Sequence, residues 1–116
     1  MEASVIIAKC DQIRKVFGVR IQRMEDGDWY RTWAFKINEN VARREGYDNA
    51  RIIGSLCKTE GFPGCPYCGS LGFYQCGTCQ RIACWNAVNI RVICPWCNAA
   101  SDITLQDSFD VKTDRF

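Results

Sequence analysis

Histidine is absent from this chain of 116 residues, and long apolar runs are absent as well. Without an imidazole, a structural metal site must be held essentially by sulfur, and no histidine can serve as a general base. No stretch approaches the roughly 20 apolar residues that a membrane-spanning helix requires. Residues 5–8 are far too few to form the apolar region of a signal peptide. We therefore expect a cytoplasmic protein without membrane contact, in a reducing compartment where clustered cysteines bind metal more often than they form disulfides.

The residue patterns that carry enzyme chemistry are also missing. The sequence has no glycine-rich strand-to-helix fingerprint for phosphate binding. Asp26 and Asp28 fall in an expected turn, where carboxylates are common for conformational reasons. Because no nucleophile with a base and no catalytic carboxylate pair can be identified, the sequence predicts that the protein is not an enzyme.

Cysteine, by contrast, is abundant: the chain has nine, and eight of them fall between residues 57 and 97. Three pairs have the C-x-x-C spacing, which lets two sulfurs of one tight turn reach a single tetrahedral ion. A chain of this length buries only a modest core, so bound metal can supply the missing stability. We predict two structural Zn²⁺ ions held by eight thiolates, from Cys57, Cys65, Cys68, Cys76, Cys79, Cys84, Cys94 and Cys97.

The order of the expected strands predicts which sulfurs share an ion. Short strands over 71–75, 81–85 and 91–93 form a meander that carries its cysteines to opposite ends. One site would then combine the sulfurs of Cys76, Cys79, Cys94 and Cys97. The other would combine Cys65, Cys68, Cys84 and a fourth ligand, most simply Cys57, with Cys10 as the second choice. In a simpler alternative, one ribbon pairs Cys65 and Cys68 with Cys94 and Cys97, and Cys10 is a small buried apolar residue.

The first half of the chain has the pattern of an antiparallel sheet. Residues 4–9, 16–24 and 29–37 predict strands, with a hairpin turn at Asp26-Gly27. Alternation places one apolar row in the core, consisting of Phe17, Val19, Ile21, Trp29, Trp33 and Phe35. Residues 39–45 predict a short helix between an Asn38 cap and Gly46, and residues 52–56 predict a further strand.

The predicted fold class is α+β and β-rich. Residues 1–56 would form a small antiparallel sheet with one short helix, and residues 57–116 a cysteine-rich ribbon with two zinc ions. We expect these two subdomains to form one folded unit, because no flexible linker separates them.

Several segments together resemble the TerY carboxy-terminal metal-binding domain. They are Trp33-Ala34-Phe35-Lys36, Arg43-Arg44-Glu45-Gly46-Tyr47, the run from Phe62 to Gly69 and Cys94-Pro95-Trp96-Cys97, and the resemblance covers roughly residues 5–100. It implies that seven cysteines are metal ligands, namely Cys65, Cys68, Cys76, Cys79, Cys84, Cys94 and Cys97. It also implies a place in bacterial tellurite-resistance and stress systems, beside a von Willebrand factor A-type module, a PP2C-like phosphatase and a protein kinase. The chain departs from the family in lacking that module and in its Cys76-Gly-Thr-Cys79 turn, where relatives have a tighter Cys-x-Cys-Gly.

These observations predict a non-catalytic zinc domain that binds a protein partner. Two four-thiolate zinc sites change the formal net charge from +2 to about −2, which disfavours nucleic acid as the partner. A nucleic-acid-binding zinc ribbon is the alternative, and a thiol-redox protein is the third possibility. Trp85 and Trp96 either shield the zinc sites or anchor the partner. Arg43 and Arg44 form either a solvated helix face or a contact to a phosphorylated partner.

Overall fold

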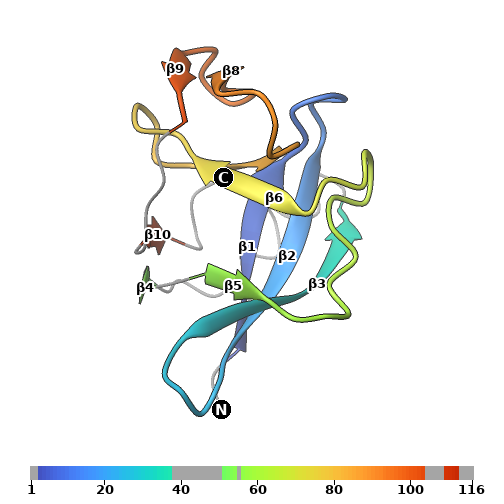
Figure 1. Ribbon diagram of the computed structural model, residues 1–116, viewed down its shortest axis with the longest axis vertical. Coiled ribbons are helices and arrows are strands. Elements are labelled where there is room, and N and C mark those ends of the chain that lie inside the picture. Colours follow the sequence, from blue (N-terminus) through green and yellow to red (C-terminus); the bar gives the residue numbers. More distant parts are fainter. Residues whose placement is uncertain (1–2, 38–50, 55, 104–108, 113–116) are drawn as a thin grey trace.

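The computed structural model describes residues 3–37, 51–54, 56–103 and 109–112, and within these residues the fold is all β (Figure 1). Six strands form one curled sheet in the order β5-β3-β2-β1-β7-β6, while β8 with β9 and β4 with β10 form two separate two-stranded sheets. The strands are β1 (Ala3–Lys9), β2 (Val16–Arg23), β3 (Trp29–Lys36), β4 (Arg51–Gly54), β5 (Leu56–Lys58), β6 (Gly72–Gln75), β7 (Ile82–Trp85), β8 (Arg91–Ile93), β9 (Ala100–Asp102) and β10 (Phe109–Lys112).

The α+β fold class predicted from the sequence is wrong. The described residues contain ten strands and no helix, and the predicted helix over 39–45, with Arg43 and Arg44, lies outside them. The main sheet is also larger than the small antiparallel sheet expected, because β6 and β7 of the cysteine-rich half extend it beside β1. Strand pairing therefore crosses the predicted boundary between residues 56 and 57. The described part of the chain includes no helix that could cross a membrane.

The β1–β2 hairpin forms the centre of the sheet because both strands alternate in the same register. Ile6 pairs with Val19 and Ala8 pairs with Phe17, so these apolar side chains lie on one face. The predicted inward row of Phe17, Val19 and Ile21 is confirmed, since each is buried. The apolar side chains of β1 and β2 thus form the middle of the concave face, and the other strands of the sheet extend this face on both sides.

The alternation predicted for β3 fails at a β-bulge. Arg20 pairs with Trp33 but the next residue, Ile21, pairs with Arg31, so Thr32 is an extra residue on β3. The bulge exchanges the two faces of the strand, and Trp33 is 54% exposed although Trp29 is buried. The prediction that Trp33 belongs to the core was therefore wrong. Before the bulge, the interior face carries Arg31.

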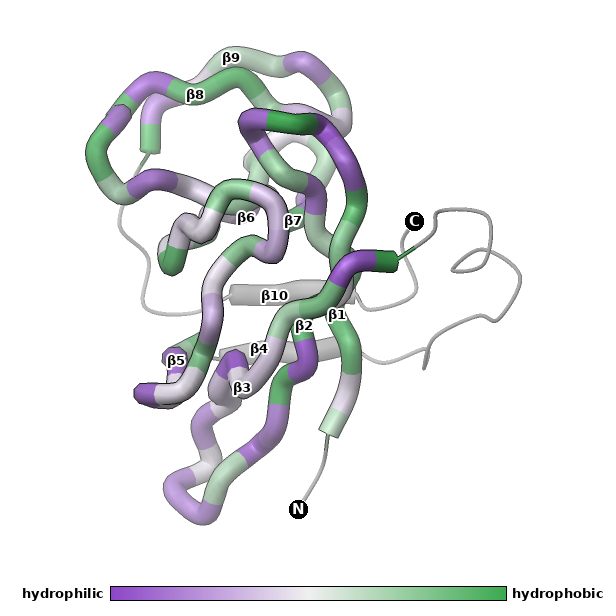
Figure 2. Tube along the Cα trace, turned by 90° about the vertical axis from the view of Figure 1, so that its right-hand side faces the viewer, coloured by the Kyte–Doolittle hydropathy of each residue, from purple (hydrophilic) through white to green (hydrophobic). Residues whose placement is uncertain are grey.

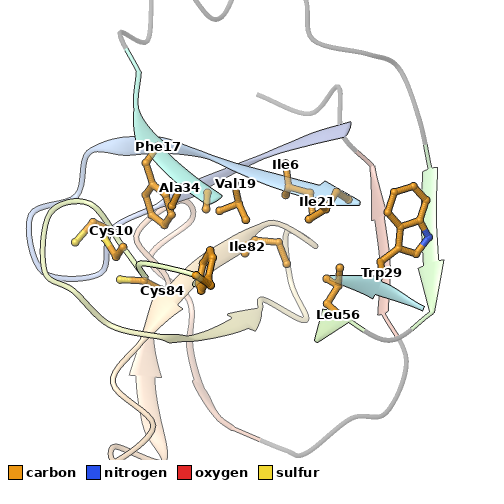
Figure 3. Packing of buried hydrophobic residues seen from close by; sticks show 13 residues of the cluster. Ile6, Cys10, Phe17, Val19, Ile21, Trp29, Ala34, Leu56, Ile82 and Cys84 are labelled. Atoms are coloured by element: carbon orange, nitrogen blue, oxygen red, sulfur yellow. The ribbon is translucent and has the colours of Figure 1, made fainter. Parts of the chain in front are cut away.

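Strand β5 extends this sheet at one edge, and the β7–β6 pair extends it at the other. The predicted strand over 52–56 is instead two strands in different sheets, because β4 pairs with β10 and β5 pairs in parallel with β3. At the other side, β7 pairs in parallel with β1, and β6 pairs antiparallel with β7. Figure 3 shows the resulting core, with Cys10 and Cys84 at one end and Trp29 and Leu56 at the other.

Candidate metal centres

The structure gathers eight cysteines into two groups of four. In each group the four sulfur atoms lie within 4.8 Å of one another, as one metal ion requires. The first group, which we call the core cluster, consists of Cys10, Cys65, Cys68 and Cys84. The second, which we call the arm cluster, consists of Cys76, Cys79, Cys94 and Cys97.

The sulfur separations fit a tetrahedral metal site. Zn–S bonds of about 2.3 Å place neighbouring sulfurs of a tetrahedron about 3.8 Å apart. The Cys68 and Cys84 sulfurs are 3.6 Å apart, and those of Cys79 and Cys94 are 3.7 Å apart. A disulfide bond is only about 2.05 Å long, and all nine cysteines are free thiols. Both clusters therefore have the donor set and the spacing of a four-thiolate metal site.

Four six-residue loops with one common backbone pattern build these clusters. In each, the N–H of the first residue donates to the carbonyl of the sixth, and the N–H of the fifth donates to the carbonyl of the first, at 2.8–3.0 Å. The fifth residue has a positive φ of 63–79° in every loop. The loops begin at Cys10, Cys65, Cys76 and Cys94, and their fifth residues are Arg14, Gly69, Gln80 and Asn98.

Three of these loops have the same place in the fold, because each joins the two strands of a hairpin. The flanking pairs are Lys9 with Val16, Gln75 with Ile82, and Ile93 with Ala100. The loop from Cys65 instead follows Gly64, whose φ is 82° and where a Cβ would lie 2.7 Å from the Ser70 carbonyl oxygen. That close approach requires glycine at position 64.

The loop at Cys10 has the same backbone pattern as the three C-x-x-C loops but only one cysteine. Ile13 occupies the position that Cys68, Cys79 and Cys97 occupy in the other loops. The missing sulfur comes from Cys84 on β7, because the parallel pairing of Lys9 with Ala83 brings the next residues, Cys10 and Cys84, to the same level. The Asp11 amide donates to the Cys84 sulfur at 3.2 Å. Cys84 thus completes the cluster from a different strand.

The structure brings together seven of the eight cysteines predicted as ligands, and it places Cys57 elsewhere. Cys57 lies on β5, paired with Tyr30 and half-buried, outside both clusters. The core cluster contains Cys10 in the place that the sequence assigned first to Cys57. Because Cys10 lacks a C-x-x-C partner, the sequence pattern did not identify it as the first choice of ligand. The sequence feature that could have done so is its position directly after a strand, which it shares with Cys76 and Cys94.

The core cluster combines one readily ionised thiol with two that resist ionisation. Burial raises the pKa of Cys65 to about 11 and raises that of Cys84 far more. Burial also opposes ionisation of Cys68, but its hydrogen bonds with Ser70, Cys84 and Cys65 together outweigh burial and lower the pKa to about 7. The buried thiols therefore need a cation beside them to become thiolates at neutral pH, and metal binding will release protons.

The arm cluster has the same electrostatic pattern. Burial raises the pKa of Cys94 to about 12 and also raises that of Cys79. Burial opposes ionisation of Cys76 too, but hydrogen bonds from the amides of Cys79 and Thr78 help to lower its pKa to about 7. The Thr78 amide lies 3.4 Å from the Cys76 sulfur. In each cluster, hydrogen bonds thus hold the pKa of one thiol well below those of its buried neighbours.

An aromatic residue in each C-P-x-C turn anchors that turn to the main sheet. The Tyr67 hydroxyl donates to the Val16 carbonyl at 2.9 Å, and its ring packs edge-on against Phe17. The Trp96 indole N–H donates to the Ile82 carbonyl at 2.8 Å, while Lys9 and Arg81 lie over its ring. Trp96 therefore contributes to packing beside the arm cluster.

Trp85 is fixed by neighbouring residues as well. Its indole N–H donates to the Asn89 carbonyl at 2.7 Å, and its ring packs against a small cluster of Tyr74, Ala83 and Val92. Both tryptophans near the sulfurs thus make hydrogen bonds and packing contacts within the fold.

No family model, curated protein or solved structure matches the chain.

Proposed function

We propose that this chain is a non-catalytic domain that binds two structural Zn²⁺ ions, one in each cluster. The observation that carries the proposal is the convergence of four free thiols at tetrahedral spacing, twice, from segments far apart in sequence. Clustered thiolates select zinc, copper(I) or iron–sulfur centres, and four thiolates at tetrahedral positions suit zinc. A complete set of four protein ligands leaves no open position for substrate, so the metal would stabilise the fold.

Metal analysis of the purified protein tests this proposal. We expect two equivalents of zinc per chain, with eight thiols protected from an alkylating reagent and one, Cys57, reacting first. Adding a chelator should expose the remaining thiols and release the metal. Well under one equivalent of bound metal, or disulfide-linked cysteines in the fresh protein, would contradict it.

We further propose that the domain binds a protein partner in a bacterial stress system linked to phosphorylation. The resemblance to the TerY carboxy-terminal metal-binding domain supports this role. It suggests a von Willebrand factor A-type module, a PP2C-like phosphatase or a protein kinase as the partner. Exposed apolar side chains at Val88 (77%), Ile90 (67%) and Ile93 (56%) also favour a protein over nucleic acid.

Binding assays with the three candidate partners test the second proposal. Size-exclusion chromatography should show a complex with at least one of them, and Val88→Ser with Ile90→Ser should weaken it while both zinc ions remain. Tight binding of nucleic acid that falls steeply with added salt would favour the zinc-ribbon alternative instead. Catalysed disulfide reduction by protein with little bound metal would favour a thiol-redox protein.

A further inference from the structure

Two cationic side chains lie over the Trp96 ring, in the C-P-x-C turn of the arm cluster. The Lys9 Nζ atom is 5.0 Å from the ring centre, and the central carbon of the Arg81 guanidinium is 4.8 Å from it. Trp96 stands between Cys94 and Cys97, two members of the arm cluster. Both cations are therefore held beside the sulfur atoms that would bind the metal.

A third cation, Arg14, reaches the same turn from the loop that begins at Cys10. Its Nη2 donates to the Pro95 carbonyl at 3.3 Å and also to the side-chain oxygen of Asn98. Among the described residues, neither Arg14 nor Lys9 forms an ion pair with a carboxylate. The structure thus holds three cations around one turn, although their printed contacts are with neutral groups.

The arm cluster becomes an anion when it binds a metal. Four thiolates around a divalent ion have a net charge of −2. The amides of Thr78 and Trp96 lie 3.4 and 3.3 Å from the sulfurs of Cys76 and Cys94. Both of these cysteines are buried, so solvent screens their charge less than it would on an open surface. A cation beside the turn will therefore stabilise the loaded cluster.

We propose that Lys9, Arg14 and Arg81 are the counter-charges of the metal-loaded arm cluster and strengthen its binding of a divalent ion. This inference rests on the proposed zinc-binding function and names residues that set the affinity of one of its two sites. The corresponding turn of the core cluster differs, because there Lys36 is 5.3 Å from the Tyr67 ring centre and the cluster belongs to the apolar core. The arm site should thus depend more strongly on nearby charge.

Competition for metal, measured at each site separately, tests the proposal. The full chain is loaded with two ¹¹³Cd²⁺ ions, and NMR gives one signal for each site; Cys97→Ser identifies the arm signal by losing it. EDTA is then added stepwise. The double variant Lys9→Met with Arg81→Met keeps apolar contact with Trp96 but removes both charges. It should bind the arm ion about tenfold more weakly, with less than about a twofold change at the core site.

Matched variants separate charge from packing. Lys9→Arg with Arg81→Lys keeps both charges and should retain most of the arm affinity that the methionine variant loses. Arg14→Met should also weaken the arm site. Arg20→Gln should leave both sites unchanged, because Arg20 is exposed and bonds Gln22 and Thr32.

Salt provides a second measurement, which needs no variant. Raising the salt concentration from about 0.05 M to about 0.5 M should weaken the arm site of the unmodified chain more than the core site, because salt screens exposed charges more effectively. Both sites are measured in one sample, so the effect of salt on EDTA cancels. Equal salt dependence of the two sites, an unchanged arm affinity in the methionine variant, or an equal loss in the charge-conserving variant would overturn the proposal and leave the zinc-binding function intact. An unmodified chain that binds no metal would contradict both.

Discussion

The two cysteine clusters have the same ligand chemistry, but they lie in different structural surroundings. In the core cluster, Cys10, Cys65 and Cys84 are buried and belong to the main apolar core together with Phe17 and Ile82. The arm cluster instead connects the β6–β7 hairpin to the β8–β9 hairpin, which pairs only with itself among the described strands. Figure 2 shows this β8–β9 arm at the opposite end of the molecule from the polar β2–β3 turn.

This difference predicts that metal binding at the two clusters has unequal effects on the stability of the fold. A metal in the core cluster would join the β1–β2 loop, the loop between β5 and β6, and β7, so its loss would affect the whole fold. A two-stranded hairpin is marginally stable alone, and the arm adds only Val92 to a small apolar cluster. A metal in the arm cluster would therefore stabilise that arm and little else.

The largest expected effect is that of Cys84→Ser in the core cluster. The variant should lose one zinc equivalent and at least about 4 kcal/mol of unfolding free energy, because the other buried thiols lose their cation. Urea denaturation and metal analysis measure both quantities. Cys57→Ser is the matched control and should keep both ions, with a change below about 1 kcal/mol. If Cys57→Ser lost a zinc ion while Cys10→Ser kept both, the fourth ligand would be Cys57.

A more local effect is expected for Cys97→Ser in the arm cluster. It should also remove one zinc equivalent, yet cost less than about 2 kcal/mol of global stability. Hydrogen exchange should accelerate at Arg91–Ile93 and Ala100–Asp102, while the amides of β1 and β2 remain protected. Equal loss of protection in both regions would show that the two clusters are not independent.

Substitutions of Tyr67 and Trp96, which anchor the two C-P-x-C turns, should show the same contrast between a global and a local loss of stability, with smaller changes. Tyr67→Phe removes only the hydroxyl bond to Val16, and we expect a loss of about 1 kcal/mol in global unfolding free energy. Trp96→Phe removes the bond to Ile82, and we expect faster exchange confined to β8 and β9. Chemical denaturation combined with residue-resolved exchange separates the two results. A global effect of Trp96→Phe that exceeds that of Tyr67→Phe would contradict the comparison.

The smallest expected effect is a change in the pKa of Tyr30, which follows the β2–β3 turn. The Tyr30 hydroxyl donates to Asp26 at 2.6 Å, and this bond raises the pKa of Tyr30 to about 12. Since the folded pKa is raised, the stabilising contribution is complete below pH 10 and is lost as pH rises through about 12. Ultraviolet or NMR titration should give this value, and Asp26→Asn should return it toward 10. The raised value should persist in Cys97→Ser and disappear in unfolded Cys84→Ser; its persistence in unfolded protein would show that the bond is local to the turn.

Local patterns predicted much of the fold because they depend on neighbouring residues. A β-branched run located β1, alternation located β2 and the buried row of Phe17, Val19 and Ile21, and turn residues located the loops. The C-x-x-C pairs together with short strands predicted the membership of the arm cluster, whose two turns belong to neighbouring hairpins. The bulge at Thr32 was not predictable in this way, because one extra residue reverses the faces of β3 without changing its composition.

The sequence by itself determined that cysteine sulfur is the candidate donor set, where the cysteine turns occur, and where β1, β2, β3, β6, β7 and β8 lie. Only the tertiary structure decided that Cys10, and not Cys57, joins Cys65, Cys68 and Cys84. It also decided that Arg31 on β3 bonds the Cys57 carbonyl on β5. The physical reason is the same in both cases. The parallel pairs β1–β7 and β3–β5 join segments far apart in the chain, and their registers depend on packing across the whole sheet, which no local spacing records.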